Sequence, residues 1–136
     1  MPRPIPTDEE IPYNGSTMIT ETDKEGFITY ANRKFVQMSG YAKEELLGYS
    51  HNIMRHPDMP KKVFKEMWQQ IKQGDAWKGY IKNLRKDGSH YWAVVFITPK
   101  HDENGQLNGF IAAREIPGPQ TLETVKAEYA AYKAEE

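Results

Sequence analysis

The chain contains two separate groups of segments in which apolar and polar residues alternate with a period of two. The first group is STMITET and FITYA, which the turn sequence DKEG joins, and it predicts a β-hairpin over residues 16–31. The second group lies in residues 77–116 and comprises WKGYIKNLRK, SHYWAVVFITP and LNGFIAAREI, separated by DG and HDENGQ. Five strands are therefore expected, and the last three form an antiparallel meander.

Between these two groups the apolar residues recur with helical spacing. Asn32 can cap a short helix that ends at Gly40, and a second short helix ends at Gly48. A longer amphipathic helix is expected between Pro60 and Gly74. Its apolar positions are Val63, Phe64, Met67, Trp68 and Ile71.

This order of elements predicts an α+β domain, a five-stranded antiparallel sheet with short helices and one longer helix packed on one face. Residues 1–15 are rich in proline and are expected to form an N-terminal arm or cap. The domain itself spans residues 16–117. Residues 118–136 form a C-terminal helix, an output element or linker, which either docks on the domain or begins a coiled coil.

The composition excludes several kinds of partner and site. Lys and Arg number 18 against 19 acidic residues, and the net charge of -1 favours neither nucleic acid nor an anionic membrane as a partner. The chain has no cysteine, so any redox activity must come from a cofactor that is not attached through sulfur. No apolar run reaches about 18 residues, and we therefore expect a cytoplasmic protein without direct membrane insertion.

One polar residue of the expected third strand falls on the face that should meet the core. Alternation from Trp77 places Asn83 on that face, where a buried amide needs hydrogen-bond partners. Asn83 either satisfies a backbone group or, together with Trp77, binds a planar heterocycle by hydrogen bonding and stacking. The opposite face is expected to be solvated, and it carries Lys78, Tyr80, Lys82, Leu84 and Lys86.

Two sequence blocks resemble a known family. The block MRHPDMP at residues 54–60, Trp77, and NLRKDGSHYW at residues 83–92 are similar to the N-terminal PAS domain of bacterial aerotaxis (Aer-type) receptors. More loosely, WKGYIKNLRKDGSHY resembles the flavin-binding PAS domain of the NifL redox regulator. The resemblance implies the PAS fold and a role as a redox, oxygen or energy sensor in aerotaxis signal transduction. It also implies a non-covalently bound FAD between the sheet and the helices.

The resemblance implies that Arg55, His56, Asp58 and Trp77 support FAD binding. Arg55 can pair with a pyrophosphate or stack on adenine, while His56 and Asp58 fix the loop or contact the ribose and adenine. Asn83 meets the edge of the isoalloxazine ring. Two further polar candidates near the mouth of the pocket are Asn32 and Asn52. The alternative is that Asp58 only shapes a turn and that His56 is a surface residue.

Other functions remain as alternatives or are disfavoured. No activated nucleophile or phosphate-binding glycine loop is present, so an enzyme is not expected. The spacing of His51 and His56 does not suit a zinc site. A haem-binding PAS domain could use His51, His56 or His90, and a ligand-free PAS domain could serve dimerisation or docking. The expected protein partner is a second copy or a receptor or HAMP-type signalling region, and the chain is either a receptor fragment or a stand-alone subunit.

The cofactor implied by the resemblance suggests how a signal could arise. Reduction changes the hydrogen-bonding groups that a flavin offers to Asn83. Asn83 could then rotate or re-pair and move the strand on which it lies. This movement would bias the N-terminal arm or the C-terminal helix between two arrangements.

Overall fold

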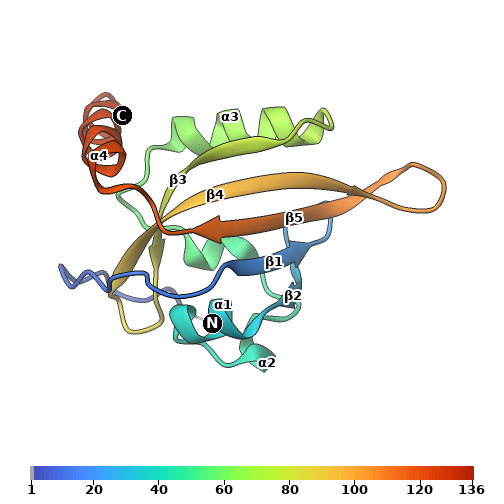
Figure 1. Cartoon of the computed structure of the whole chain (residues 1–136), viewed down its shortest axis with the longest axis horizontal. Coiled ribbons are helices and arrows are strands. Elements are labelled where there is room, and N and C mark those ends of the chain that lie inside the picture. Colours follow the sequence, from blue (N-terminus) through green and yellow to red (C-terminus); the bar gives the residue numbers. More distant parts are fainter. Residues whose placement is uncertain (1) are drawn as a thin grey trace.

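The computed structural model describes residues 2–136 and contains one five-stranded antiparallel sheet in the order β2-β1-β5-β4-β3 (Figure 1). The strands are β1 (Met18–Thr22), β2 (Ile28–Ala31), β3 (Trp77–Leu84), β4 (His90–His101) and β5 (Leu107–Glu115). The helical elements are α1 (Arg33–Ser39), α2 (Lys43–Leu46), the 3-10 helix η1 (His51–Met54), α3 (Lys61–Lys72) and α4 (Pro119–Ala134). The predicted α+β fold is confirmed.

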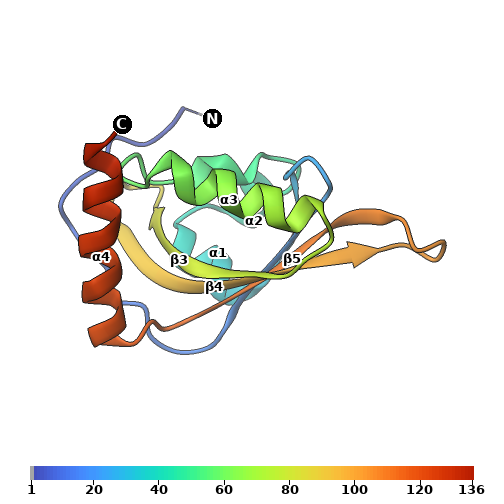
Figure 2. The ribbon, with the colours of Figure 1, turned by 90° about the horizontal axis from the view of Figure 1, so that it is seen from above.

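Local signals in the sequence fix the ends of the helices that cover one face of the sheet. The side chain of Asn32 accepts a hydrogen bond from the Phe35 amide and caps α1, and Gly40 ends α1 with a φ of 78°. The longer helix α3 begins after Pro60 and buries its apolar stripe against the sheet, as its spacing predicts. Figure 2 shows α3 lying along the sheet.

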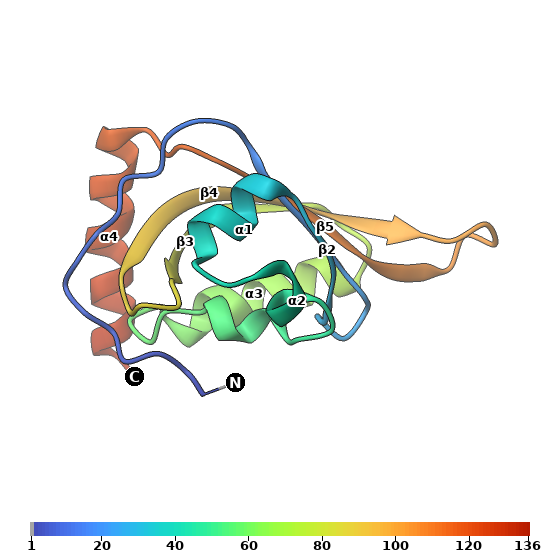
Figure 3. The same ribbon diagram turned by 90° about the horizontal axis from the view of Figure 1, so that it is seen from below.

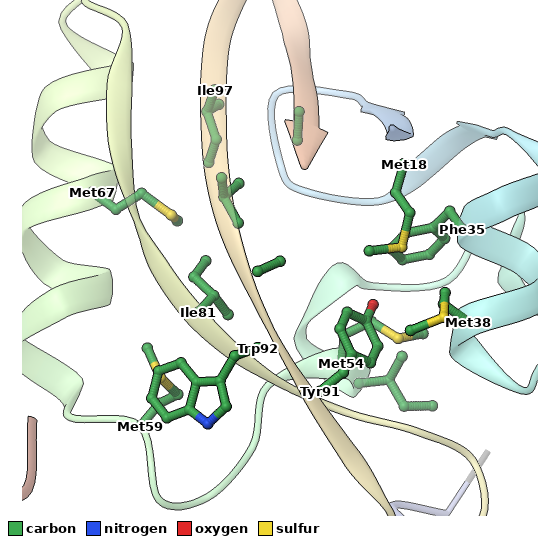
Figure 4. Close-up of a cluster of buried hydrophobic side chains, with 14 of the residues drawn as sticks. Met18, Phe35, Met38, Met54, Met59, Met67, Ile81, Tyr91, Trp92 and Ile97 are labelled. Atoms are coloured by element: carbon green, nitrogen blue, oxygen red, sulfur yellow. The ribbon is translucent and has the colours of Figure 1, made fainter. Parts of the chain in front are cut away.

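The core lies between these helices and the inward-facing side chains of the strands. In β5 the alternate residues Phe110, Ala112 and Arg114 are buried, as expected for a period of two, whereas the first six residues of β4 are all buried. Figure 4 shows buried side chains on both sides of β3 and β4. Those on the side of α1 include Met18, Phe35, Met38, Met54 and Tyr91.

The expectation that the opposite face of β3 is solvated is wrong for part of the strand. Lys78 is exposed, but Tyr80 and Lys82 are half-buried and Leu84 is only 1% exposed. Tyr80 is covered by α4, which lies at the end of the sheet away from the β4–β5 hairpin (Figures 1 and 3). The Tyr129 hydroxyl of α4 donates a hydrogen bond to the Tyr80 carbonyl at 2.8 Å.

The C-terminal helix is therefore docked rather than free to begin a coiled coil. The ring of Tyr129 packs on Trp92 of β4, with 6.0 Å between the ring centroids. At the end of the chain, the Glu136 carboxylate accepts a hydrogen bond of 2.7 Å from the Lys61 amide, the first residue of α3. This carboxylate caps a helix that has no side-chain cap of its own.

The N-terminal arm is attached to the β3–β4 turn by backbone hydrogen bonds. The Thr7 amide donates to the Gly88 carbonyl at 2.9 Å, and the Ile11 amide donates to the His90 carbonyl at 2.7 Å. Gly88 has a φ of 90°, and a side chain there would lie 2.1 Å from the Ile5 carbonyl oxygen. Only glycine permits this close approach of the arm.

The segment after η1 contacts the edge of β3 and places consecutive residues on opposite faces of the sheet. Arg55 forms a β-bridge with Asn83 and faces the helices, whereas His56 packs edge to face on His90, with 5.6 Å between the ring centroids. Both histidines are buried, and His56 Nε2 and His90 Nδ1 have no hydrogen-bond partner. Burial and the nearby Lys82 ammonium lower the pKa of His56 to about 4.

We expect the stability of the protein to fall as the pH is lowered through the range between the unfolded and folded pKa values of His56. The unfolded pKa of about 6.5 exceeds the folded pKa of about 4, so the unfolded state binds more protons in this interval. A His56→Asn variant should reduce the pH slope of the unfolding free energy by up to about 1.4 kcal/mol per pH unit.

Urea denaturation between pH 7 and pH 4.5 measures this slope. The matched control is His101→Asn, because His101 is exposed. An unchanged slope in the His56→Asn variant would contradict the expectation.

Candidate functional site

A cavity lies between α3, η1 and the inner face of the sheet. The volume of this cavity is about 80 Å³, smaller than that of typical small-molecule sites, so a larger ligand would require its lining side chains to move apart. Most of the wall is apolar. The polar side chains that line it include Thr20, His51, Asn52, Arg55, Asn83 and Arg114.

The guanidinium of Arg114 is a buried positive charge in this wall. Arg114 is 2% exposed and donates hydrogen bonds to the Thr20 hydroxyl at 3.1 Å and to the Ala112 carbonyl at 3.3 Å. No carboxylate of residues 2–136 forms an ion pair with it. Burial lowers its pKa to about 10, so it remains charged at neutral pH. A buried charge of this kind needs an electron-rich partner.

His51 is the other side chain that pairs with Arg114. Its Nε2 lies 2.8 Å from Arg114 Nη2, and because a guanidinium can only donate, Nε2 accepts and the imidazole is neutral. Burial and the charge of Arg114 lower the pKa of His51 to about 3. Since its Nε2 is engaged and His56 and His90 do not line the cavity, the geometry disfavours the haem alternative.

The side chain of Asn83 forms one hydrogen bond with the described residues. It is 3% exposed, and its Nδ2 donates a hydrogen bond of 3.3 Å to the hydroxyl of Tyr91, which lies directly opposite on β4. The amide oxygen of Asn83 is therefore left for a molecule in the cavity. This arrangement agrees with the expectation that Asn83 faces the core.

Two arginines lie at the η1 side of the cavity. The guanidinium of Arg55 stacks on the Phe64 ring, 3.7 Å from its centroid, and its buried Nε has no hydrogen-bond partner. Arg3 of the N-terminal arm donates hydrogen bonds to the Asn52 carbonyl at 3.0 Å and to the Arg55 carbonyl. Arg55 and Asn52 therefore line this side of the cavity, and the exposed Arg3 lies beside them without lining it.

Of the candidate residues from the sequence, Arg55, Asn52 and Asn83 line the cavity. His56 faces the opposite side of β3. Asp58 is exposed and forms a 3.0 Å ion pair with Lys82, which lowers the pKa of the Asp58 carboxyl.

The two remaining candidates lie outside the lining. Asn32 caps α1, and its Nδ2 donates to the Thr17 carbonyl at 3.0 Å, so both ends of its amide are engaged. The Trp77 ring lies over Gly79, where a side chain would approach it to 2.2 Å. Trp77 thus occupies the expected face of β3 without lining the cavity.

Arg114 and Arg3 are the residues that the sequence reasoning missed, and His51 was considered only as a haem ligand. A signal for Arg114 was present, because Phe110, Ala112 and Arg114 share one face of β5 and an arginine interrupts that apolar face. No local signal identifies Arg3, whose role depends on the path of the arm.

The described residues lack two other kinds of feature. No group of three or more His, Cys, Asp or Glu side chains among residues 2–136 could hold a metal ion. No helix in this range is sufficiently long and apolar to cross a membrane.

Comparisons with known proteins identify the family. Residues 28–114 match the family model described as the PAS fold. The aerotaxis receptor of Escherichia coli K12 is 39% identical over 132 residues, which is 96% of this chain and 26% of the receptor. The nitrogen fixation regulatory protein of Klebsiella pneumoniae is 34% identical over 79% of this chain and 22% of that protein. The chain thus spans about a quarter of the length of these relatives.

Solved structures agree with the fold. The light-state structure of the blue-light photoreceptor Aureochrome1 LOV has a TM-score of 0.73 at 20% identity, with 82% of this chain and 89% of that chain covered. A PAS domain from Colwellia psychrerythraea has a TM-score of 0.62 at 27% identity, with 74% and 86% covered. The predicted resemblance is confirmed, and the chain belongs to the PAS family.

Proposed function

We propose that the chain is a PAS sensor that binds FAD non-covalently and reports its redox state in signal transduction of the aerotaxis type. The observation that carries this proposal is Arg114, a buried guanidinium without a carboxylate partner among residues 2–136, in a mostly apolar cavity that also presents the amide of Asn83. A flat aromatic ligand with hydrogen-bonding groups on one edge suits both features.

The isoalloxazine ring would occupy the interior of the cavity. The side chains of Phe64, Ile81 and Val95 provide apolar contacts for the ring, while Asn83 and Arg114 meet its polar edge. When bound, FAD accepts electrons and protons and becomes more electron-rich. The positive charge of Arg114 stabilises that form, because its own charge has no counter-ion in the wall.

The adenosine diphosphate portion of the cofactor distinguishes FAD from FMN and riboflavin. Arg55 is free at its buried Nε, and a guanidinium suits a pyrophosphate. Arg3 and Asn52 lie beside it and add further donors. We therefore assign the adenosine diphosphate portion of FAD to the η1 side of the cavity.

Two candidates that do not line the cavity, His56 and Asp58, support Arg55 indirectly. The Nδ1 atom of His56 accepts a hydrogen bond of 3.0 Å from the Asp58 amide, and the Asp58 carboxylate pairs with Lys82 of β3. These contacts fix the turn after Arg55 against the edge of β3. In this proposal His56 and Asp58 hold Arg55 in position and do not touch the cofactor.

The output of the sensor would come from the arm at residues 1–15 and the helix at residues 118–136. Rotation or re-pairing of Asn83 moves β3, and both elements contact β3 or the turn that follows it. The partner would be a second copy or a receptor or HAMP-type signalling region, and the setting would be cytoplasmic. No catalytic turnover is part of this proposal.

The first prediction concerns the cofactor itself. Protein purified in air should be yellow, with the absorption bands of an oxidised flavin, and denaturation should release a compound that co-migrates with FAD and not with FMN. Chromatography against both standards checks this. A colourless protein that also fails to bind added FAD would refute the proposed function.

A second prediction separates the two halves of the cofactor. Arg55→Gln should weaken FAD binding at least about tenfold, equivalent to about 1.4 kcal/mol, because a charge-assisted contact with the pyrophosphate is lost. Binding of riboflavin, which has no phosphate, should change little. Fluorescence titration of the apoprotein with each ligand measures both affinities, and equal losses for the two ligands would argue against the assigned orientation.

A third prediction concerns the charge of Arg114. In Arg114→Gln the reduced cofactor loses an electrostatic partner, so the midpoint potential should become more negative by about 30 mV or more, a tenfold change for two electrons. Spectroscopic titration against redox dyes measures the potential. The control is Arg33→Gln, because Arg33 is exposed on α1. A potential equal to that of the control would show that Arg114 does not act on the flavin.

A further inference from the structure

Tyr91 is a buried phenol that does not line the cavity but contacts Asn83, which does. It is fully buried on β4, and its hydroxyl accepts the 3.3 Å hydrogen bond from Asn83 Nδ2. Within residues 2–136 this is the only hydrogen bond of the Asn83 side chain. The orientation of the Asn83 amide therefore depends on one hydroxyl group.

A hydroxyl group is suited to hold an amide in either of two orientations. In the observed orientation the hydroxyl oxygen accepts from Nδ2, and the amide oxygen faces the cavity as an acceptor. After a half-turn of the amide, the hydroxyl would donate to the amide oxygen, and Nδ2 would face the cavity as a donor. Neither orientation leaves the Asn83–Tyr91 contact unsatisfied, so the exchange does not cost a buried hydrogen bond.

The second orientation requires that Tyr91 keeps its proton. Burial raises the pKa of Tyr91 above its ordinary value, so the phenol remains neutral at physiological pH. The hydroxyl is therefore available both as an acceptor and as a donor.

The ring of Tyr91 also contacts the base of the N-terminal arm. It meets the ring of Tyr13 edge to face, with 6.4 Å between the centroids and 77° between the planes. The Tyr13 hydroxyl lies 2.8 Å from the carbonyl oxygens of both Ser16 and Arg114 and donates its one hydrogen to this pair of acceptors. Figure 4 shows Tyr91 among buried side chains that include Met38 and Met54, so its ring has little freedom to move without its neighbours.

We propose that Tyr91 is a positioning residue for this cavity, whose hydroxyl holds the Asn83 amide in two alternative orientations and whose ring connects that choice to Tyr13 at the base of the arm. The inference rests on the proposed flavin function. A ligand edge that offers a donor selects the orientation with the amide oxygen toward the cavity, and an edge that offers an acceptor selects the other.

The test variant is Tyr91→Phe, which keeps the ring and removes the hydroxyl. Its matched control is Tyr41→Phe, because Tyr41 is also buried, at 3% exposure, but its hydroxyl has no hydrogen-bond partner. Movement of the arm is followed with a fluorophore attached through Ile5→Cys, a side chain that is 85% exposed. The label is specific because the chain has no other cysteine.

The measurement compares the three labelled proteins before and after reduction of bound FAD with dithionite. Tyr91→Phe should bind FAD within about threefold of the parent, whereas its change in fluorescence on reduction should fall at least twofold. Its relative affinity for oxidised and reduced FAD, obtained from the midpoint potential, should change at least threefold. Tyr41→Phe should match the parent in all three readouts.

The outcomes separate this inference from the proposed function. A parent protein that does not bind FAD refutes both. A parent that binds FAD and responds to reduction, together with a Tyr91→Phe variant that retains the full response and the parental potential, overturns the role of Tyr91 alone. If Tyr91→Phe does not fold, as judged by circular dichroism, Asn83→Leu decides instead, since a full arm response without the amide also overturns the inference.

Discussion

The structure depends on the β-bridge between Arg55 and Asn83, which attaches the segment after η1 to the free edge of β3. In an extended segment consecutive side chains point to opposite faces, so this one contact sends Arg55 into the cavity and His56 to the other side of the sheet. The turn that follows then starts α3. A short polar sequence thus closes one end of the cavity and also contacts the outer face, where α4 and the arm lie.

The buried charge of Arg114 destabilises the folded protein and at the same time favours binding of an electron-rich ligand in the cavity. A guanidinium buried without a counter-ion destabilises the folded chain. Thr20, His51, the Ala112 carbonyl and the Phe35 ring, whose centroid lies 4.7 Å from the guanidinium, offset this only with neutral groups. A ligand that brings electron density to Arg114 recovers part of the lost energy on binding. The affinity of such a ligand would depend on its charge, which is the property that a redox sensor must detect.

Local patterns predicted the strands and helices, because alternation, Asn32 at a helix start and glycines at helix ends act over a few residues. They also placed Asn83 on the inner face of β3. They could not predict that Tyr80 is half-buried, because it contacts Tyr129 of α4, which is distant in sequence. Arg114 and His51 meet across 63 positions of the chain, and no short motif encodes that pairing.

The arm and α4 differ from the core in how strongly they are held. The arm is joined to the β3–β4 turn and β4 by a few backbone hydrogen bonds, each contributing about 0.5–1.5 kcal/mol, and to α4 by the exposed contact between Glu10 and Lys126. At its base, Ile11 and Tyr13 pack on the core. Detaching the residues before Ile11 therefore costs less than opening the core, because it leaves Tyr13 in place. A change of similar size in the cavity, such as an altered pairing of Asn83, is enough to shift the population of the attached arm, whereas it would not unfold the sheet.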